Sequence, residues 1–246
     1  MKTALLGYGK MGKEIERTAL ERKHEIILKV DEQSFIDDDI SKLGGADAAI
    51  EFSVPVAAFK NIITCFEAGV PVVCGTTGWT ERMEEIKSEC KKKNGTFFYS
   101  PNFSIGVNIF FELNRKLASL MKEQKNYEPF IHEVHHVHKK DKPSGTALKL
   151  AEDIIRSGGN KTKWEPADEN FSEEEKNKRG NELLVFSRRE NEIPGTHEVK
   201  YISDDDEILI THKAYNRKGF ALGAVLAAEW LQGRKGIFGM NDMLKL

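Results

Sequence analysis

Apolar and polar residues over the first hundred positions follow a pattern that alternates between short buried strands and amphipathic helices. Compact apolar runs predict five strands, and segments with apolar residues at helical spacing lie between most of them. The predicted strands cover residues 3–6, 26–30, 47–52, 71–74 and 96–99, and the helices between them end near residues 22, 68 and 93. Right-handed crossovers between such strands give a parallel sheet with helices on both faces. The pattern therefore predicts a doubly wound α/β domain.

After residue 127 the pattern changes, and strand-like segments with polar alternation follow one another. They cover residues 130–137, 183–188, 198–202 and 207–212. A helix over 147–155 and a longer helix over 104–121 accompany them. Residues 157–180 contain few apolar side chains, which indicates a long surface loop with at most a short helix at 172–179. This half is predicted to be an α+β domain with a mixed or antiparallel sheet.

The end of the chain returns to the first domain. Residues 220–231 predict a strongly apolar helix, and such a helix needs a large hydrophobic partner. We therefore expect a discontinuous first domain made of residues 1–103 and 217–246. The second domain, residues 104–216, lies between these two portions, with hinges expected near Phe103 and Arg217.

The turn after the first strand carries a glycine fingerprint typical of Rossmann dinucleotide-binding domains, Gly7-Tyr8-Gly9-Lys10-Met11-Gly12. The first glycine allows the tight turn, the second lets the backbone approach a pyrophosphate, and the third lets the helix pack on the strand. The second strand ends at Asp31, 24 residues after Gly7, where an acidic residue binds the ribose hydroxyls. The first domain is therefore predicted to bind a nicotinamide cofactor.

The residues at the end of the second strand also predict which cofactor is preferred. Asp31-Glu32-Gln33 place negative charge where the 2′-phosphate of NADPH would lie, which favours NADH. Lys10 and Lys13 could partly compensate for that charge. We predict a modest preference for NADH, with NADPH still used.

Two more loops are expected at the same edge of the parallel sheet, because both follow predicted strands. Gly75-Thr76-Thr77-Gly78 is a second glycine-rich loop, and open α/β sheets bind ligands at this edge. Ser100-Pro101-Asn102-Phe103 follows the fifth strand. It is interpreted either as part of the site or as the plain start of a helix.

A basic segment at residues 135–147 is the candidate centre of chemistry, with three histidines and three lysines within eight residues. Ser144 can cap the following helix, so the amides of Gly145 and Thr146 can bind a carboxylate or phosphate. Histidine transfers protons near neutral pH, and a neighbouring lysine can donate one. The segment is predicted to bind an anion and protonate the molecule that carries it, although a lysine-rich run is also typical of a solvated turn.

A zinc site is the competing interpretation of the same region. His132-Glu133-Val134-His135-His136 matches the H-E-x-x-H motif, whose histidines bind zinc only when the segment is helical. Pro129 and the β-branched residues that follow favour a strand, and we expect no metal. The apolar spacing at 130, 131, 134 and 137 would also suit a helix, so both alternatives stay open.

Composition limits the classes of function. With 39% hydrophobic residues and a net charge of −2 over 246 residues, the chain has no basic field for nucleic acid. Cys65, Cys74 and Cys90 are odd in number and lack metal-ligand spacing, as expected for reduced thiols of a cytoplasmic protein. The longest apolar runs fall short of a signal peptide or a membrane span, so no membrane partner is predicted.

Taken together, these motifs resemble the bacterial dihydrodipicolinate reductase (4-hydroxy-tetrahydrodipicolinate reductase) family of lysine and diaminopimelate biosynthesis. The resemblance rests on the two glycine loops, residues 101–108, Glu133 with the basic segment through Ala147, and residues 210–214. It implies that the second domain binds substrate and that homotetramers assemble through its sheets. It also implies NADH or NADPH as cofactor and a small dicarboxylate as substrate.

The resemblance assigns roles to particular residues. It implies that His135 serves as acid/base, that Lys139 donates a proton, and that His136, Gly145 and Thr146 bind the substrate carboxylates. The implied cofactor-binding residues are Gly7, Tyr8, Gly9, Lys10, Met11, Gly12, Asp31, Gly75, Thr76, Thr77, Ser100, Pro101, Asn102 and Phe103.

The leading hypothesis is the reduction of a cyclic imine dicarboxylate, 4-hydroxy-tetrahydrodipicolinate, to tetrahydrodipicolinate. In this hypothesis hydride passes to a conjugated carbon of the ring and a proton is added at the neighbouring carbon. Two alternatives are a zinc hydrolase that uses His132, Glu133 and His136, and a regulator that senses NAD without turnover. Zinc content and reductase activity distinguish them.

Overall fold

The computed structural model describes residues 1–31, 40–167 and 180–246. Within these ranges the chain divides into two compact units: unit 1 is Met1–Asn108 with Arg217–Leu246, and unit 2 is Ile109–Asn216. The chain leaves unit 1 inside helix α4 (Ile105–Met121) rather than at residue 103, and it returns at Arg217. No helix among the described residues is long and apolar enough to span a membrane.

Unit 1 contains a parallel sheet of six strands in the order β11-β5-β4-β3-β1-β2. The strands are β1 (Lys2–Leu6), β2 (Glu25–Val30), β3 (Ala48–Glu51), β4 (Val72–Cys74), β5 (Thr96–Tyr99) and β11 (Gly236–Phe238). The strand order reverses direction between β1 and β3, and ligands of doubly wound sheets bind beside that point. The five strands predicted from apolar runs are confirmed, whereas β11 was missed.

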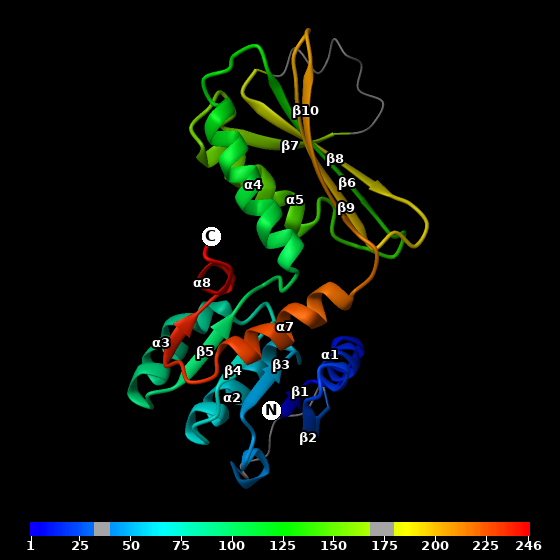
Figure 1. Cartoon of the computed structure of the whole chain (residues 1–246). Coiled ribbons are helices and arrows are strands. Elements are labelled where there is room, and N and C mark those ends of the chain that lie inside the picture. The colour runs from blue at the N-terminus through cyan, green and yellow to red at the C-terminus, as the bar shows by residue number, and fades with distance from the viewer. Residues whose placement is uncertain (32–39, 168–179) are drawn as a thin grey trace. The chain divides into compact units, whose positions relative to one another are not determined.

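Helices cover both faces of this sheet (Figure 1). The amphipathic helices α2 (Pro55–Glu67) and α3 (Met83–Lys92) pack on one face, and α1 (Lys10–Glu21) and α7 (Lys218–Trp230) pack on the other. The large apolar partner that α7 was expected to need is therefore the sheet together with α1. Short elements complete the unit: η1 (Ile40–Leu43), η2 (Thr80–Arg82) and α8 (Met240–Leu244).

Unit 2 contains a mixed sheet in the order β10-β9-β6-β8-β7. Its strands are β6 (Glu128–His135), β7 (Lys163–Ala167), β8 (Glu182–Arg189), β9 (Gly195–Ile202) and β10 (Glu207–Ala214). β6 runs antiparallel to β9 and parallel to β8, which confirms the predicted mixed sheet. The long-loop prediction missed β7, and the short helix expected at 172–179 lies outside the described residues.

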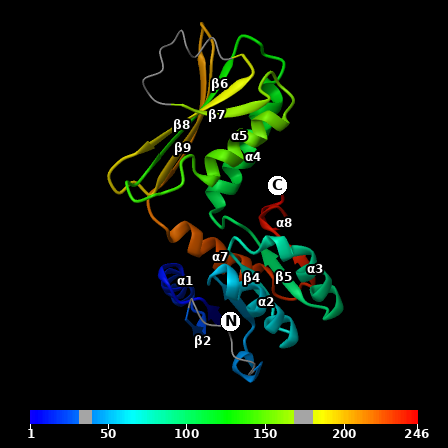
Figure 2. The same ribbon diagram turned by 180° about the vertical axis from the view of Figure 1, so that it is seen from behind.

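Helices α4 and α5 (Gly145–Arg156) lie along one face of the unit 2 sheet, as both views show (Figures 1 and 2). Residues 131, 183, 185, 199 and 201 point from the strands into the core beneath these helices. Because side chains alternate along a strand, Glu133 and His135 share the face of Ile131. The sheet therefore directs a carboxylate and an imidazole toward the helix-covered side.

Candidate active site

The fingerprint turn of unit 1 can be formed only by glycine at two positions. Gly7 has φ +99°, and a Cβ there would lie 2.2 Å from the carbonyl oxygen of Phe52. A Cβ on Gly12 would lie 2.2 Å from the carbonyl oxygen of Gly7. Both distances are far shorter than any van der Waals contact, so backbone packs directly on backbone here. The predicted roles of the first and third glycines agree with this geometry.

The start of α1 suits a pyrophosphate. Gly9 is the N-cap and supplies no side-chain hydrogen bond, so the cap leaves the first amides of the helix without a side-chain acceptor. These amides, on Lys10, Met11 and Gly12, lie at the positive end of the helix dipole, where an anion is favoured. The residues present therefore fit a dinucleotide cofactor.

The other predicted cofactor loops follow β4 and β5, and Phe52 packs against both. A Cβ on Gly75 would lie 2.2 Å from the Phe52 ring, and the ring centroid of Phe103 lies 5.5 Å from that of Phe52. In the loop after β4, Thr76 is buried and its hydroxyl oxygen has no hydrogen-bond partner, so a polar group of a ligand could serve it. Phe52, directly after β3, thus contacts three loops at one edge of the sheet: the fingerprint turn at Gly7, the loop at Gly75 and the loop at Phe103.

The loop after β5 is fixed by its own hydrogen bonds. Ser100 Oγ donates to the carbonyl of Asn102 at 2.7 Å, and Asn102 Oδ1 accepts from the amide of Ser104 at 2.9 Å. Pro101 is exposed, whereas Phe103 is buried against Phe52. The loop both starts a helix and reaches the carboxyl edge of the sheet, so the two interpretations of it are compatible.

The end of β2 carries charge of both signs. Asp31 follows the strand directly and is exposed, whereas Glu32 and Gln33 lie outside the described residues. The ammonium of Lys29, two residues earlier, is bound by the Glu16 carboxylate and lies 4.9 Å from the centre of the Tyr8 ring. Lys29 lowers the pKa of Glu16, through a hydrogen bond above all. Lys29, a cation of this strand, is therefore already paired.

In unit 2, strands β6 and β9 bring a carboxylate and two imidazoles together on the helix side of the sheet. Glu133 pairs with His197 in the strand register, and the rings of His135 and His197 lie 4.9 Å apart. All three side chains are buried, with only 1% to 6% of their surface exposed. His135 Nδ1 lies 3.3 Å from Glu133 Oε2 and His197 Nε2 lies 3.7 Å from the same oxygen.

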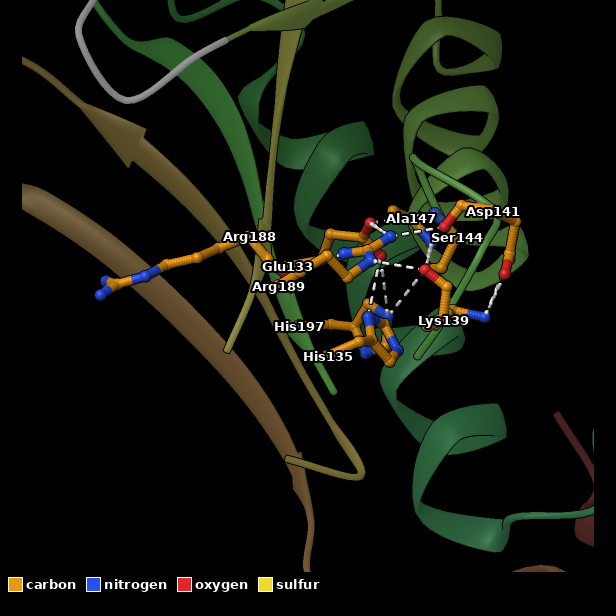
Figure 3. Close-up of polar contacts among 9 residues, drawn as sticks. All are labelled: Glu133, His135, Lys139, Asp141, Ser144, Ala147, Arg188, Arg189 and His197. Atoms are coloured by element: carbon orange, nitrogen blue, oxygen red, sulfur yellow. Dashed lines mark hydrogen bonds and ion pairs between the residues drawn. The ribbon is translucent and has the colours of Figure 1, made fainter. Parts of the chain in front are cut away.

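The other oxygen of Glu133 is also occupied (Figure 3). Glu133 Oε1 accepts hydrogen bonds from the amide of Ser144 at 3.0 Å and from Nη2 of Arg189 at 3.1 Å. Burial alone would raise the pKa of Glu133, but its contacts with His135 and Ser144 outweigh burial, so its pKa is lower than usual. The carboxylate is therefore ionised at neutral pH.

His197 is kept neutral by its surroundings. Burial lowers the pKa of His197 to about 3, and the charge of neighbouring His135 adds to that shift. Its Nε2 lies 3.1 Å from the hydroxyl oxygen of Ser144. At neutral pH His197 is therefore an uncharged imidazole beside the ionised carboxylate of Glu133.

Lys139 lies in the turn after β6, where its ammonium contacts the Asp141 carboxylate at 2.7 and 2.8 Å. Lys139 belongs to a segment with many basic residues, but the charged group that its ammonium contacts is the carboxylate of Asp141. His136, one residue beyond β6, has a buried Nδ1 without a hydrogen-bond partner. His138 is exposed and pairs with Glu192 at 3.2 Å.

The predicted anion-binding turn starts α5. Ser144 is the N-cap, and its hydroxyl oxygen accepts a hydrogen bond from the amide of Ala147 at 3.2 Å. The helix begins at Gly145, two residues earlier than the apolar pattern indicated. Gly145 is exposed and a Cβ there would meet no atom within 4 Å, so its amide and that of Thr146 can approach a carboxylate.

The H-E-x-x-H interpretation lacks the helix that it needs, because residues 132–135 belong to strand β6. The ring of His132 stacks on Phe186 at 4.6 Å, away from Glu133. Ligand atoms of Glu133, His135 and His197 do lie within 4.8 Å of one another, which is close enough for a metal ion. However, the Arg189 guanidinium already provides the positive charge at Glu133, which disfavours a cation there.

Sequence patterns did not single out several of these residues. Arg189 and His197 come from β8 and β9, and Phe52 follows β3. Glu133 is one of the residues that carry the family resemblance, but the resemblance assigned it no role. A local signal existed for Phe52, an aromatic residue directly after a strand at the sheet's switch point. None existed for Arg189, which meets Glu133 from 56 residues away.

Comparison with known proteins identifies the family to which this chain is similar. A family model described as dihydrodipicolinate reductase, N-terminus, matches residues 1–103, and one described as dihydrodipicolinate reductase, C-terminus, matches residues 106–244. A 4-hydroxy-tetrahydrodipicolinate reductase of Christiangramia forsetii is 46% identical over 246 residues, which cover 99% of this chain and 98% of the relative. One of Archaeoglobus fulgidus is 42% identical over 212 residues, or 85% and 80% of the two chains.

Solved structures share the fold. A dipicolinate-bound dihydrodipicolinate reductase from Paenisporosarcina sp. TG-14 is similar with a TM-score of 0.74 and 24% identity over 99% of both chains. A probable dehydrogenase from Thermotoga maritima is similar with a TM-score of 0.54 and 11% identity, covering 98% of this chain and 92% of the other. At these identities the likeness concerns the fold alone.

Proposed function

This chain belongs to the dihydrodipicolinate reductase family, and from that premise we propose how its two units divide the reaction. The protein is an NAD(P)H-dependent reductase of 4-hydroxy-tetrahydrodipicolinate in lysine and diaminopimelate biosynthesis. The observation that carries this conclusion is that both domains of the family match one chain, nearly end to end. The division of work between the units rests on the geometry described above.

Unit 1 would hold the cofactor through its backbone. The amides at the start of α1 bind the pyrophosphate, Asp31 binds the ribose, and the loops at 75–77 and 100–103 lie at the same sheet edge. When bound, NADH or NADPH supplies the hydride. This assignment is supported by the close packing of the fingerprint glycines and by the buried hydroxyl of Thr76, which has no hydrogen-bond partner among the described residues.

Unit 2 would bind the dicarboxylate and deliver the proton. The amides of Gly145 and Thr146, together with His136, bind the carboxylates. Loss of the 4-hydroxyl group as water would leave a conjugated ring, which accepts a hydride at one carbon and a proton at the neighbouring carbon. His135 acts as acid/base and Lys139 as proton donor in these proton transfers. The support is that an ionised carboxylate lies at Nδ1 of His135, which suits an imidazole that gives up and regains a proton.

The cofactor preference is for NADH, with NADPH still accepted. Asp31 is exposed at the end of β2, where it would repel a 2′-phosphate, and Lys29 is already paired with Glu16. Exchanging Asp31 for Ser and Glu32 for Arg should shift the ratio of kcat/KM values toward NADPH. A clearly higher kcat/KM with NADPH in the unchanged protein would contradict this preference.

Unit 1 is the cofactor domain, and unit 2 binds substrate and assembles a homotetramer. Support for assembly comes from the edge strand β10, where Ile208 and Leu209 are 37% and 43% exposed. Replacing Leu209 by Lys should lower the mass measured by sedimentation. A cytoplasmic location is consistent with three buried, unpaired cysteines.

The reductase activity is tested by mixing the purified protein with NADH and substrate generated in situ by the preceding synthase. We expect the NADH absorbance to fall only when substrate is present. A folded protein that binds NADH and leaves its absorbance unchanged would instead favour the regulator that senses NAD without turnover.

A further inference from the structure

Glu133 lies at the meeting point of the groups that carry the proposed chemistry of unit 2. It is 1% exposed, and a buried carboxylate costs several kcal/mol unless it is fully partnered. Each of its partners comes from a different segment: β6, β8, β9 and the start of α5. Such a cost is retained in a protein when the charge has a use.

The first partner connects Glu133 to the anion-binding turn. The amide of Ser144 donates to Glu133 Oε1 at 3.0 Å, and Ser144 is the residue that caps α5. The orientation of this amide therefore sets where the next two amides, those of Gly145 and Thr146, point. A carboxylate bound there depends on Glu133 indirectly.

The second partner connects Glu133 to the turn that carries Lys139. Arg189 donates to Glu133 Oε1, and the same guanidinium donates to the carbonyl oxygens of Lys139, at 3.3 Å, and Asp141. One guanidinium thus ties the buried carboxylate to the backbone of the turn. The planar, five-donor fork of arginine suits this task, and lysine has no equivalent.

The third partner is His135, and here the carboxylate determines which ring nitrogen works. Glu133 Oε2 lies 3.3 Å from Nδ1, which leaves Nε2, on the other side of the ring, as the nitrogen that exchanges protons. Beside Nε2 lies Gly195, with φ +155°, where a Cβ would be 3.0 Å from that nitrogen. A side chain at position 195 would therefore press against Nε2 of His135.

We propose that Glu133 is the positioning residue of the active site, which holds His135, the Lys139 turn and the start of α5 in one arrangement through its two oxygens. This inference rests on the proposed function of unit 2 and adds to it the residue on which three functional groups depend. His197 completes the arrangement as a neutral imidazole that contacts both the carboxylate and Ser144.

The test is the exchange Glu133→Gln, which keeps the shape of the side chain and removes its charge. The charged and titratable groups beside His135 are Glu133, Arg189 and His197. Arg189 also contacts the backbone of the turn that carries Lys139 and Asp141. Without the carboxylate, the imidazolium loses its counter-charge. We expect kcat to fall by on the order of 10²-fold and the alkaline limb of its pH profile to move to lower pH.

Two binding measurements show whether the effect is confined to unit 2. The affinity for pyridine-2,6-dicarboxylate, measured by calorimetry, should fall, whereas the affinity for NADH should stay within about twofold. Glu192→Gln is the matched control, because Glu192 pairs with the exposed His138 and with no group assigned to the reaction. That variant should keep the kcat and pH profile of the unchanged protein.

The outcomes separate this proposal from the proposed function. If the unchanged protein reduces the substrate and Glu133→Gln keeps its kcat and pH profile, the positioning role is wrong and the reductase activity stands. If Glu133→Gln does not fold, Arg189→Lys carries the test, since it keeps the charge and cannot bridge Glu133 and the turn. We expect a tenfold or larger fall in kcat with unchanged NADH affinity, and an unchanged kcat would overturn the proposal.

Discussion

In unit 1 the candidate cofactor site is made mainly of backbone, whereas in unit 2 the candidate proton-transfer site is made of side chains from separate strands. The cofactor cradle needs glycines that let one carbonyl approach another segment, as Gly7 does with Phe52. The acid–base cluster needs Glu133, Arg189 and His197 to meet across three strands. The first site follows from local geometry, and the second depends on strand register.

This difference has a physical consequence for how each site fails. A backbone site is lost when a side chain is added, because there is no room for a Cβ. A side-chain network is lost when one partner is removed, because the remaining buried polar groups are left without hydrogen bonds. The two sites can therefore be damaged separately, and each kind of damage should leave the other site intact.

The largest expected effect comes from removing the acid–base group of unit 2. His135→Gln or Lys139→Ala should lower kcat by on the order of 10²- to 10⁴-fold, the usual contribution of general acid catalysis. The dissociation constant for NADH, measured by fluorescence titration, should change little. His138→Gln is the control, since His138 is exposed and its ion pair is with Glu192, which has no assigned role. Near-normal turnover in both variants would mean that the cluster is a surface charge patch.

A smaller effect, in the other unit, is expected from adding one methyl group. In Gly7→Ala the new Cβ would lie 2.2 Å from a carbonyl oxygen, so the turn must move. We expect the NADH dissociation constant to rise at least about tenfold, which corresponds to roughly 1.4 kcal/mol.

The control for this substitution is Gly69→Ala. Gly69 also has a positive φ, +68°, but a Cβ there would meet nothing within 4 Å. This variant carries similar backbone strain and should bind NADH normally. If both variants bind NADH equally well, the close approach at Gly7 has no part in cofactor binding.

The two strands that sequence patterns missed, β11 and β7, are both edge strands. β11 and β7 lie at the ends of their sheets, and each is paired on one side only. β11 has three residues including a glycine, and β7 contains Lys163, Glu165 and Pro166. Edge strands are often short, charged or interrupted by proline, so they lack the apolar run that marks a central strand. The central strands and the long helices were predicted because their burial imposes such a pattern.

The two sites differ in the same way. The loops of unit 1 could be found from glycines and from their position after strands, because the signal lies within a few residues. His135, Lys139 and Ser144 were also found, since they belong to one segment. Arg189 and His197 were not, because only the pairing of β6 with β8 and β9 brings them to Glu133. Strand register is a tertiary property that local patterns do not carry.

A still smaller effect, on stability, is expected from His197, the neutral imidazole beside Glu133. Burial lowers the pKa of His197 to about 3, whereas an unfolded histidine titrates near 6.5. Between these values the unfolded chain binds a proton that the folded chain does not, so the free energy of unfolding falls as the pH drops. His197→Asn should reduce this loss by on the order of 1 to 2 kcal/mol between pH 7 and pH 5.

Urea unfolding at the two pH values measures this difference. The variant should be less stable than the unchanged protein at pH 7, because the contact with Ser144 is lost, and the gap should narrow at pH 5. A gap that stays constant would mean that His197 does not remain uncharged in the folded chain.

The central claim is that the reaction takes its two hydrogens from different units, a hydride from the cofactor of unit 1 and a proton through the side chains of unit 2. The most direct measurement uses NADH that carries deuterium on one or the other face of the nicotinamide ring, with the product analysed by mass spectrometry. We expect one deuterium in the product from one face and none from the other, at the ring carbon that does not exchange with water. Product without deuterium from either labelled cofactor would contradict the account.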